Sequence, residues 1–367
     1  MLMITCPYGL TGILNNELKK LWHSPQDSFD TGTFVDAGLD DCYRINIWSR
    51  IANKVFLKLN SPSICLDFDE LFELVKSITW DQYIGPGQWI SVKVHTRQSN
   101  IDSQKSAQSI VHKAIMTSLT WEKDKERNID NDWHRHTIFV VINKNICSVY
   151  INTSGSSLHQ RWYRDAAWEA PLKENIAAAL VQLAGWNFKK PLLDPCCGSG
   201  TICIEAAMIA RNIAPGLQRY FAFEHFPVYD EAKFKTIRTK AKESKYDKTY
   251  TIMWSDVDEE MLKIAKENAA HMWVADTISF VYGDILDHTQ RKTPLADAEL
   301  TIITNPPYGK RMDDNVSEIH HILSTITSKK SIILTWYEWS KNLFSDGSRS
   351  WKVTKNGAEE TNIFLSK

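Results

Sequence analysis

The chain lacks an excess of positive charge. Its 367 residues hold 43 Lys and Arg against 44 Asp and Glu, which gives a formal net charge of −1. Residues 1–155 contain 16 basic and 17 acidic side chains, and residues 156–367 contain 27 of each. This balance excludes a protein that binds nucleic acid through a general positive field, so an RNA partner must meet local basic patches.

Cysteine is present, but not in the spacing that holds a metal. None of the seven cysteines forms a C-x-x-C pair, which argues against a structural zinc site, and we expect no bound metal. An odd number in a chain of this length also argues against a disulfide framework. Free thiols favour a reducing compartment, and we expect a cytoplasmic protein. The cysteines are residues 6, 42, 65, 147, 196, 197 and 203.

Long apolar runs are missing as well. No stretch approaches the ~20 apolar residues that a membrane-spanning helix requires. The segment from Met1 to Leu10 has no basic residue and is interrupted by Pro7, unlike a secretory signal. We therefore expect no membrane partner. We also favour a monomer.

The first 155 residues mix helical and strand patterns. Apolar residues at helical spacing predict helices, and alternating or β-branched runs predict strands. The order favours one or two α+β units with antiparallel pairing. The predicted helices are 13–21, 67–78 and 110–119, and the predicted strands are 2–6, 34–35, 43–47, 89–94, 137–143 and 146–152.

Beyond Gly155-Ser156-Ser157, which we predict to be a hinge, short apolar strands alternate with helices. This alternation predicts an α/β, Rossmann-like fold, in which helices cover both faces of a mostly parallel sheet. The last two strands flank Asn356-Gly357 and predict an antiparallel hairpin. The predicted strands are 192–194, 251–255, 278–282, 300–304, 331–336, 351–354 and 361–365, and the predicted helices are 201–213 and 258–271.

The segment Asp194-Pro-Cys-Cys-Gly-Ser-Gly200 lies between a predicted strand and a predicted helix. Gly198 and Gly200 allow the backbone to turn sharply and approach a ligand. The carboxyl end of a strand is also where open α/β sheets bind ligands. The pattern is neither G-x-G-x-x-G nor a P-loop, which disfavours a dinucleotide and a P-loop nucleotide. A glycine turn that serves only packing is the alternative.

Acidic residues follow the next two predicted strands. Asp256 can accept hydrogen bonds from both hydroxyls of a ribose, and Asp284 can accept one from an adenine amino group. Each has a plainer explanation when taken singly, because Asp is a common helix N-cap, and Asp256 or Asp258 could cap the following helix. Together, acids at three successive strand ends indicate a cofactor that contains a nucleoside.

The fourth strand of this half runs into Asn305-Pro306-Pro307-Tyr308. Methylating an exocyclic amine is difficult because its lone pair is delocalised into the ring. The side-chain carbonyl of Asn305 and the main-chain carbonyl of Pro306 can accept from the two N–H groups. The prolines hold that carbonyl still, and Tyr308 can stack on a flipped or single-stranded base. We predict that these four residues are catalytic; a loop merely stiffened by two prolines is the alternative.

Four strings in the second half, together with N-P-P-Y, carry a family resemblance. They resemble the THUMP-domain RNA guanine-N2 methyltransferases, most closely the group that acts on large-subunit (23S) ribosomal RNA. The strings are Leu158-His-Gln-Arg-Trp-Tyr-Arg164, Ala170-Pro-Leu-Lys-Glu-Asn-Ile-Ala177, Pro191-Leu-Leu-Asp-Pro-Cys-Cys-Gly-Ser-Gly200 and Ala210-Arg-Asn-Ile-Ala-Pro-Gly216.

The resemblance implies three parts: a ferredoxin-like region at 1–50, a THUMP RNA-binding domain at 51–155, and a class I methyltransferase domain with a seven-stranded sheet at 156–367. It implies S-adenosylmethionine as the cofactor. Two positions depart from the family, which often has Phe where Cys196 stands and usually Gly where Trp162 stands. The implied cofactor-binding residues are Asp194, Cys196, Gly198, Gly200, Asp256, Asp284, Asn305 and Pro171.

Three local features are candidate RNA contacts. Arg161 and Arg164 interleave with aromatic rings at the domain junction, and Lys310 and Arg311 follow the catalytic loop. The segment 233–248 contains seven basic residues against two acidic ones, which predicts a basic helix face suited to phosphates. A solvated helix face and a packed interdomain segment are the plainer alternatives.

The sequence leaves the methyl acceptor open. N-P-P-Y also serves adenine N6 in DNA and the glutamine amide of proteins, and transfer-RNA guanine-N2 enzymes share THUMP. The N-terminal 155 residues favour RNA, and the strings at 170–177 and 210–216 favour the ribosomal group. A non-catalytic RNA-binding or assembly factor is the least favoured hypothesis, because the acids, the glycines and Asn305 are intact.

Overall fold

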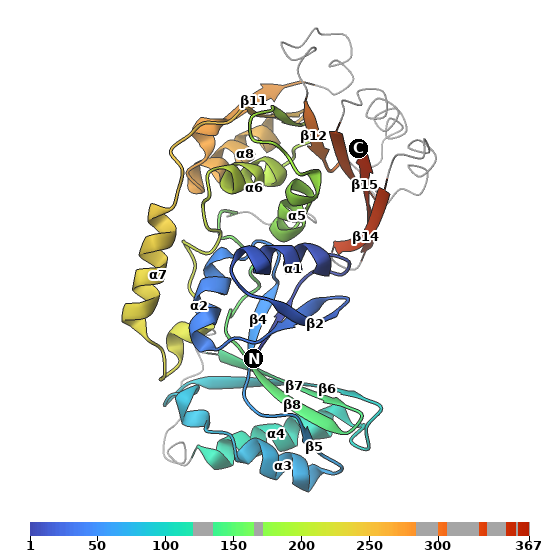
Figure 1. Cartoon of the computed structure of the whole chain (residues 1–367), viewed down its shortest axis with the longest axis vertical. Coiled ribbons are helices and arrows are strands. Elements are labelled where there is room, and N and C mark those ends of the chain that lie inside the picture. The colour runs from blue at the N-terminus through green and yellow to red at the C-terminus, as the bar shows by residue number, and fades with distance from the viewer. Residues whose placement is uncertain are drawn as a thin grey trace.

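Two β-sheets organise the chain in the computed structural model (Figure 1). The structure describes residues 1–119, 135–164, 172–283, 300–306, 330–335, 350–356 and 359–366. An eight-stranded sheet is built from strands within the first 152 residues, and a seven-stranded sheet begins at residue 192. α6 (Thr201–Ala210) and α8 (Glu259–His271), beside the second sheet, lie at the opposite end of the molecule from α3 (Phe68–Lys76) and α4 (Gln104–Ser118) (Figure 1).

The first sheet has the order β2-β3-β1-β4-β8-β7-β6, with β5 paired to β8. β4 pairs antiparallel with both β1 and β8, so one sheet joins the two N-terminal units. Most pairs are antiparallel as expected, but β6 and β7 are parallel. The strands are β1 Leu2–Thr5, β2 Pro25–Phe29, β3 Gly32–Val35, β4 Lys54–Lys58, β5 Ser63–Ile64, β6 Trp89–Arg97, β7 Arg135–Asn143 and β8 Ile146–Asn152.

Four helices accompany this sheet: α1 Thr11–Lys20, α2 Leu39–Trp48 and α4 Gln104–Ser118 contact its strands, and α3 Phe68–Lys76 packs against α4. The strand predicted at 43–47 is wrong, because these residues lie in α2. Tyr43, Ile45 and Ile47 are all buried, so the helix is covered on more than one side and shows no clear helical stripe. A short apolar run of this kind does not distinguish a strand from a buried helix.

The second sheet has the order β11-β10-β9-β12-β13-β15-β14 and confirms the predicted α/β class. The first five strands in this order, β11, β10, β9, β12 and β13, are parallel to one another. β15 pairs antiparallel with both β13 and β14. The strands are β9 Leu192–Asp194, β10 Ile252–Asp256, β11 Ile278–Tyr282, β12 Thr301–Thr304, β13 Lys330–Thr335, β14 Ser350–Asn356 and β15 Glu359–Ser366. The helices are α5 Glu174–Ala184, α6 Thr201–Ala210, α7 Glu231–Glu243 and α8 Glu259–His271.

The segment that joins the two sheets is tightly packed. Arg219, 2% exposed, donates to the carbonyls of Ser154, Ser156 and Ser157. The Gly216 N–H donates to the Ile47 carbonyl at 2.9 Å. These bonds fix the chain at 154–157, where the sequence suggested a hinge, and hold the N-terminal unit against the second sheet.

Candidate active site

The glycine loop places the start of α6 beside β10. Gly200 caps α6 with a φ of +82°, a left-handed conformation that favours glycine. A Cβ at Gly200 would lie 2.2 Å from Cζ3 of the buried Trp254 and 3.1 Å from the Cβ of Ala265. Gly198 also has a positive φ, of +50°, with open space where its Cβ would be. Gly200 is therefore required for packing, whereas Gly198 leaves one side of the loop open to a ligand.

Asp194 ends β9 and is 1% exposed. Its Oδ1 accepts from the Cys196 N–H at 3.2 Å and from the Thr304 hydroxyl at 2.8 Å. Among the described residues its Oδ2 has no hydrogen-bond partner, although it is buried. Burial raises the pKa of Asp194 from 3.8 to about 7, against the lowering effect of those two hydrogen bonds. A buried acceptor without a partner is the feature expected of a site that a polar ligand completes.

The pKa of Asp194 predicts a pH-dependent stability. Between pH 4 and 7 the folded protein keeps the proton that the unfolded chain releases, so this group's contribution to stability is present at pH 4 and is lost as pH rises through 7. Asp194→Asn removes this loss and retains an acceptor for Thr304. We expect the variant to gain about 2 kcal/mol of unfolding free energy over the wild type at pH 8, and much less at pH 4.5. Denaturant unfolding of the free protein at both pH values measures this; an equal difference at both would contradict it.

Asp256 and Asp258 have separate roles at the end of β10. Asp258 caps α8, because its Oδ1 accepts from the N–H groups of Glu260 and Met261. Asp256 accepts from the Gly198 N–H at 2.8 Å, which ties this carboxylate to the glycine loop. Each carboxylate oxygen of Asp256 accepts one backbone N–H, so lone pairs remain for ligand hydroxyls. Asp256 is therefore available to the cofactor, and the capping alternative applies to Asp258.

Asn305 directly follows β12, the strand next to β9 in the sheet. Its side-chain Oδ1 is buried and has no partner within the described part of the chain. Thr304 links the two strands through its hydrogen bond to Asp194. The structure thus brings Asn305, Pro306 and the glycine loop to one edge of the sheet.

Several predicted site residues lie outside the described residues. The Gly283 N–H donates to the Asp256 carbonyl at 3.3 Å, so the chain that leads to Asp284 passes beside Asp256. The predicted site residues that lie outside the described residues are Pro171, Asp284, Pro307, Tyr308, Lys310 and Arg311.

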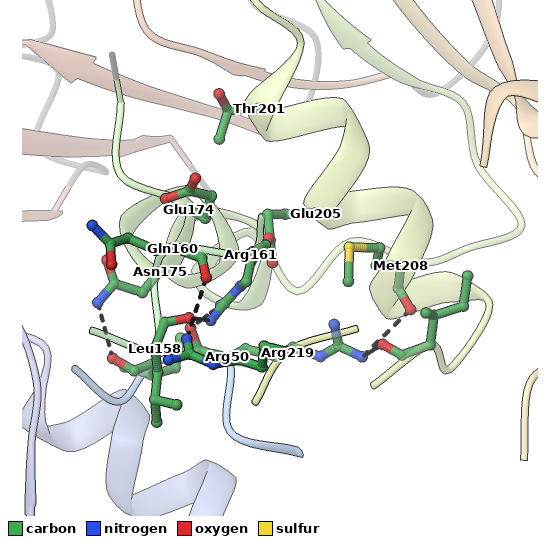
Figure 2. A network of polar contacts seen from close by, with 12 residues as sticks. Arg50, Leu158, Gln160, Arg161, Glu174, Asn175, Thr201, Glu205, Met208 and Arg219 are labelled. Atoms are coloured by element: carbon green, nitrogen blue, oxygen red, sulfur yellow. Dashed lines mark hydrogen bonds and ion pairs between the residues drawn. The ribbon is translucent and has the colours of Figure 1, made fainter. Parts of the chain in front are cut away.

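The prediction that Arg161 contacts RNA is wrong. Its side chain is 1% exposed and forms an ion pair with Glu205 of α6 at 3.3 Å (Figure 2). The same guanidinium donates to the carbonyls of Leu158 and Arg50, so it is committed to the junction between the two sheets. Arg161 therefore belongs to a packed interdomain segment, which was the alternative to an RNA contact.

Arg164 also faces inward rather than toward RNA. Its side chain is 16% exposed, and it bonds to Thr201, Glu174 and the Leu172 carbonyl. Trp162, between the two arginines, has a φ of +68° and is 45% exposed. This left-handed backbone accounts for glycine at the corresponding position in the family that the sequence resembles.

Sequence reasoning missed two polar residues that support the loop. Thr304 holds Asp194, and the Asn268 side chain donates to the Ser199 carbonyl at 3.1 Å. Thr304 had a signal, because it directly precedes Asn305. Asn268 lies inside α8 and had none. Cys197 is buried, and burial raises its thiol pKa, so it carries no thiolate chemistry.

The donors and acceptors at this edge fit an adenosine-containing cofactor. Asp256 offers carboxylate oxygens beside a glycine loop, and Asp194 and Asn305 offer buried oxygens that lack partners within the described ranges. No group of three or more His, Cys, Asp or Glu that could hold a metal occurs among the residues whose positions are described. Likewise, no helix in the described ranges is long and apolar enough to cross a membrane.

Comparisons with known proteins agree with this geometry. Residues 161–335 match the RMKL-like methyltransferase domain, residues 1–56 the RlmL ferredoxin-like domain, and residues 65–152 the THUMP domain. YpsC of Bacillus subtilis (strain 168), named as a candidate RNA methyltransferase, is 35% identical over 322 residues, which are 85% of this chain and 80% of YpsC.

Solved structures of similar proteins align with the whole length of this chain. SMU.472, a candidate methyltransferase in complex with SAH, is 31% identical with a TM-score of 0.85, covering 100% of this chain and 97% of that one. A predicted N6-adenine-specific DNA methylase from Listeria monocytogenes is 29% identical with a TM-score of 0.87, covering 100% and 95%. The chain therefore belongs to the family of RMKL-like methyltransferases that carry RlmL ferredoxin-like and THUMP domains.

Proposed function

We propose that this protein transfers a methyl group from S-adenosylmethionine to the exocyclic N2 of a guanine in large-subunit (23S) ribosomal RNA, in the cytoplasm. The observation that carries the proposal is the position of Asn305. It directly follows β12, the strand next to that of Asp194, and presents a buried acceptor without a partner in the described region. An acceptor for an amine thus lies next to the cofactor loop.

The chain's own residues can perform the positioning that this chemistry requires. When bound, the cofactor supplies an electrophilic methyl group on its sulfonium. Asp256 and the glycine loop orient the nucleoside, and Asp194 holds the loop through the Cys196 N–H. Asn305 and the Pro306 carbonyl accept from the amine, which localises its lone pair for attack on the methyl carbon. The nitrogen releases one of its two protons after the transfer, and the sulfonium becomes the neutral thioether of S-adenosylhomocysteine.

RNA as the acceptor is supported by the N-terminal half. The THUMP match at 65–152 and the name of YpsC both point to RNA. The name of the Listeria relative points instead to adenine in DNA, and the same Asn-Pro-Pro-Tyr loop could serve that amine. The acceptor is therefore the part of the proposal that experiment must decide.

Mapping of modified nucleosides tests the proposal directly. Ribosomal and transfer RNA from a deletion strain should lack one N2-methylguanosine in large-subunit RNA, and purified protein should restore it from labelled S-adenosylmethionine. Loss of the mark from transfer RNA would move the substrate to that class. Transfer of label to DNA with none to RNA would overturn the proposal.

The basic helix α7 predicts part of the RNA surface. α7 lies along one flank of the molecule and packs beside α2 (Figure 1). Lys233 and Arg238 are committed to Asp40 and Glu224, but Lys235 and Lys242 are exposed on one face, two turns apart. The Lys235→Glu/Lys242→Glu variant should weaken RNA binding and lower the dependence of log Kd on log salt by about 1 per lysine.

A matched double reversal on α1 provides the control. Lys19 and Lys20 are exposed at the end of α1, so Lys19→Glu/Lys20→Glu changes the net charge equally. Filter binding to large-subunit RNA at several salt concentrations compares the two variants. Equal losses would show that α7 contributes only general charge.

A further inference from the structure

The guanidinium of Arg164 links the starts of α5 and α6. One Nη donates to the Thr201 hydroxyl and, at 2.9 Å, to the Leu172 carbonyl. The other lies 3.6 Å from the Glu174 carboxylate. Thr201 is the first residue of α6, and Glu174 is the first residue of α5.

These contacts lie at the cofactor edge of the sheet. α6 begins where the glycine loop ends, and α5 packs against α6 and against β12, the strand that leads to Asn305. Figure 2 shows Thr201 and Glu174 at one side of the buried network, away from Arg50 and Arg219. Arg164 therefore belongs to the loop's support rather than to the interdomain network.

The burial of this group indicates a specific role. Thr201 is 4% exposed and the Glu174 side chain 7%, so the arginine charge is removed from most of the surrounding water. Such burial is tolerated only when the charge is paired and hydrogen-bonded; here both Nη groups have partners, whereas Nε has none among the described residues. A lysine ammonium is a point charge and cannot match this planar arrangement of donors.

We infer that Arg164 is a positioning residue for S-adenosylmethionine, which holds the glycine loop in its binding conformation through Thr201. Thr201 directly follows Gly200, and its hydroxyl lies 3.4 Å from that of Ser199. Fixing Thr201 limits the conformations of residues 198–200, so less ordering remains for ligand binding. The inference rests on the proposed function because it takes S-adenosylmethionine as the cofactor. It does not depend on which RNA is methylated.

Binding of S-adenosylhomocysteine to the full-length protein, measured by calorimetry, tests this inference. Arg164→Gln should raise the Kd about tenfold, and Arg164→Lys should fall between it and the wild type. Thr201→Val should also weaken binding, and the double variant should be little weaker than either single one, because both remove the same link. In methyl-transfer assays the KM for S-adenosylmethionine should rise about tenfold, with a much smaller change in kcat.

Arg211 supplies the matched control for a buried arginine. It is 3% exposed at the other end of α6, where it pairs with Asp276 at 2.5 Å. Arg211→Gln should lower stability without weakening S-adenosylhomocysteine binding. Equal weakening by both arginine variants, or an unchanged Kd in Arg164→Gln, would overturn the inference. A wild-type protein that binds neither S-adenosylhomocysteine nor S-adenosylmethionine would contradict the proposed function itself.

Discussion

Replacing Asn305 with alanine should lower kcat for methyl transfer by about 10²–10³, which corresponds to roughly 3–4 kcal/mol of transition-state stabilisation. The physical reason is the loss of the side-chain carbonyl, whose Oδ1 is buried without a partner in the described structure. Binding of S-adenosylhomocysteine should change far less, because Asp194 and the loop remain. Single-turnover transfer to under-methylated RNA and calorimetry on the same preparation measure the two effects.

A conservative variant separates chemistry from folding in this experiment. Asn305→Asp keeps an acceptor at the same place and should retain more activity than Asn305→Ala. Both variants should unfold at similar denaturant concentrations, since the Oδ1 of Asn305 accepts no hydrogen bond from the residues that the structure describes. If Asn305→Ala keeps more than half of the wild-type rate, Asn305 is not catalytic and the proposed mechanism fails.

The strands of the second half could be predicted because their signals are local, whereas the helix at Glu174–Ala184 was missed. The strands at 192–194 and 278–282 have the same bounds in the structure as in the sequence pattern, and α8 differs by one residue at its start. In parallel α/β folds the carboxyl ends of neighbouring strands share one edge. Asp194, Asp256 and Asn305 end or follow the neighbouring strands β9, β10 and β12, so the observed strand order brings them to one edge.

The N-terminal half was less predictable because its sheet depends on distant pairs. β4 joins the two units by pairing Leu57 with both Leu2 and Ile151. No local pattern specifies such partners, and the parallel pairing of β6 with β7 is equally non-local. The boundary at residues 50 and 51, which the family resemblance implied, could not show that one continuous sheet crosses it.

The two arginines at the junction show a different limit of sequence reasoning. An Arg-Trp-Tyr-Arg string has the composition of a nucleic-acid contact, but burial cannot be read from composition. The missing information was the acidic partner of each arginine, Glu205 for Arg161 and Glu174 for Arg164. Both glutamates lie in apolar helical stretches, which is a usable signal for a buried ion pair.

Removing one member of the buried Arg161–Glu205 pair should cost about 3–5 kcal/mol of unfolding free energy. Arg161→Ala leaves the Glu205 carboxylate, which is 0% exposed, without its cation. It also leaves the carbonyls of Leu158 and Arg50 without their donor. Because Arg50 belongs to the N-terminal unit, we expect this unit to lose protection from hydrogen exchange at the junction with the second sheet. Denaturant unfolding and exchange of backbone amides measure the two effects.

The size of this loss should depend on the charge left behind rather than on the pair itself. Arg161→Met combined with Glu205→Leu removes both charges and should recover most of the stability lost in Arg161→Ala, because a buried ion pair adds little over an apolar pair of similar volume. Arg211→Met is the comparison: one of its acidic partners, Asp247, is fully exposed and Asp276 is 60% exposed, so both remain hydrated without it. A double variant as unstable as Arg161→Ala would show that the lost hydrogen bonds to Leu158 and Arg50, and not the unpaired carboxylate, hold the two halves of the protein together.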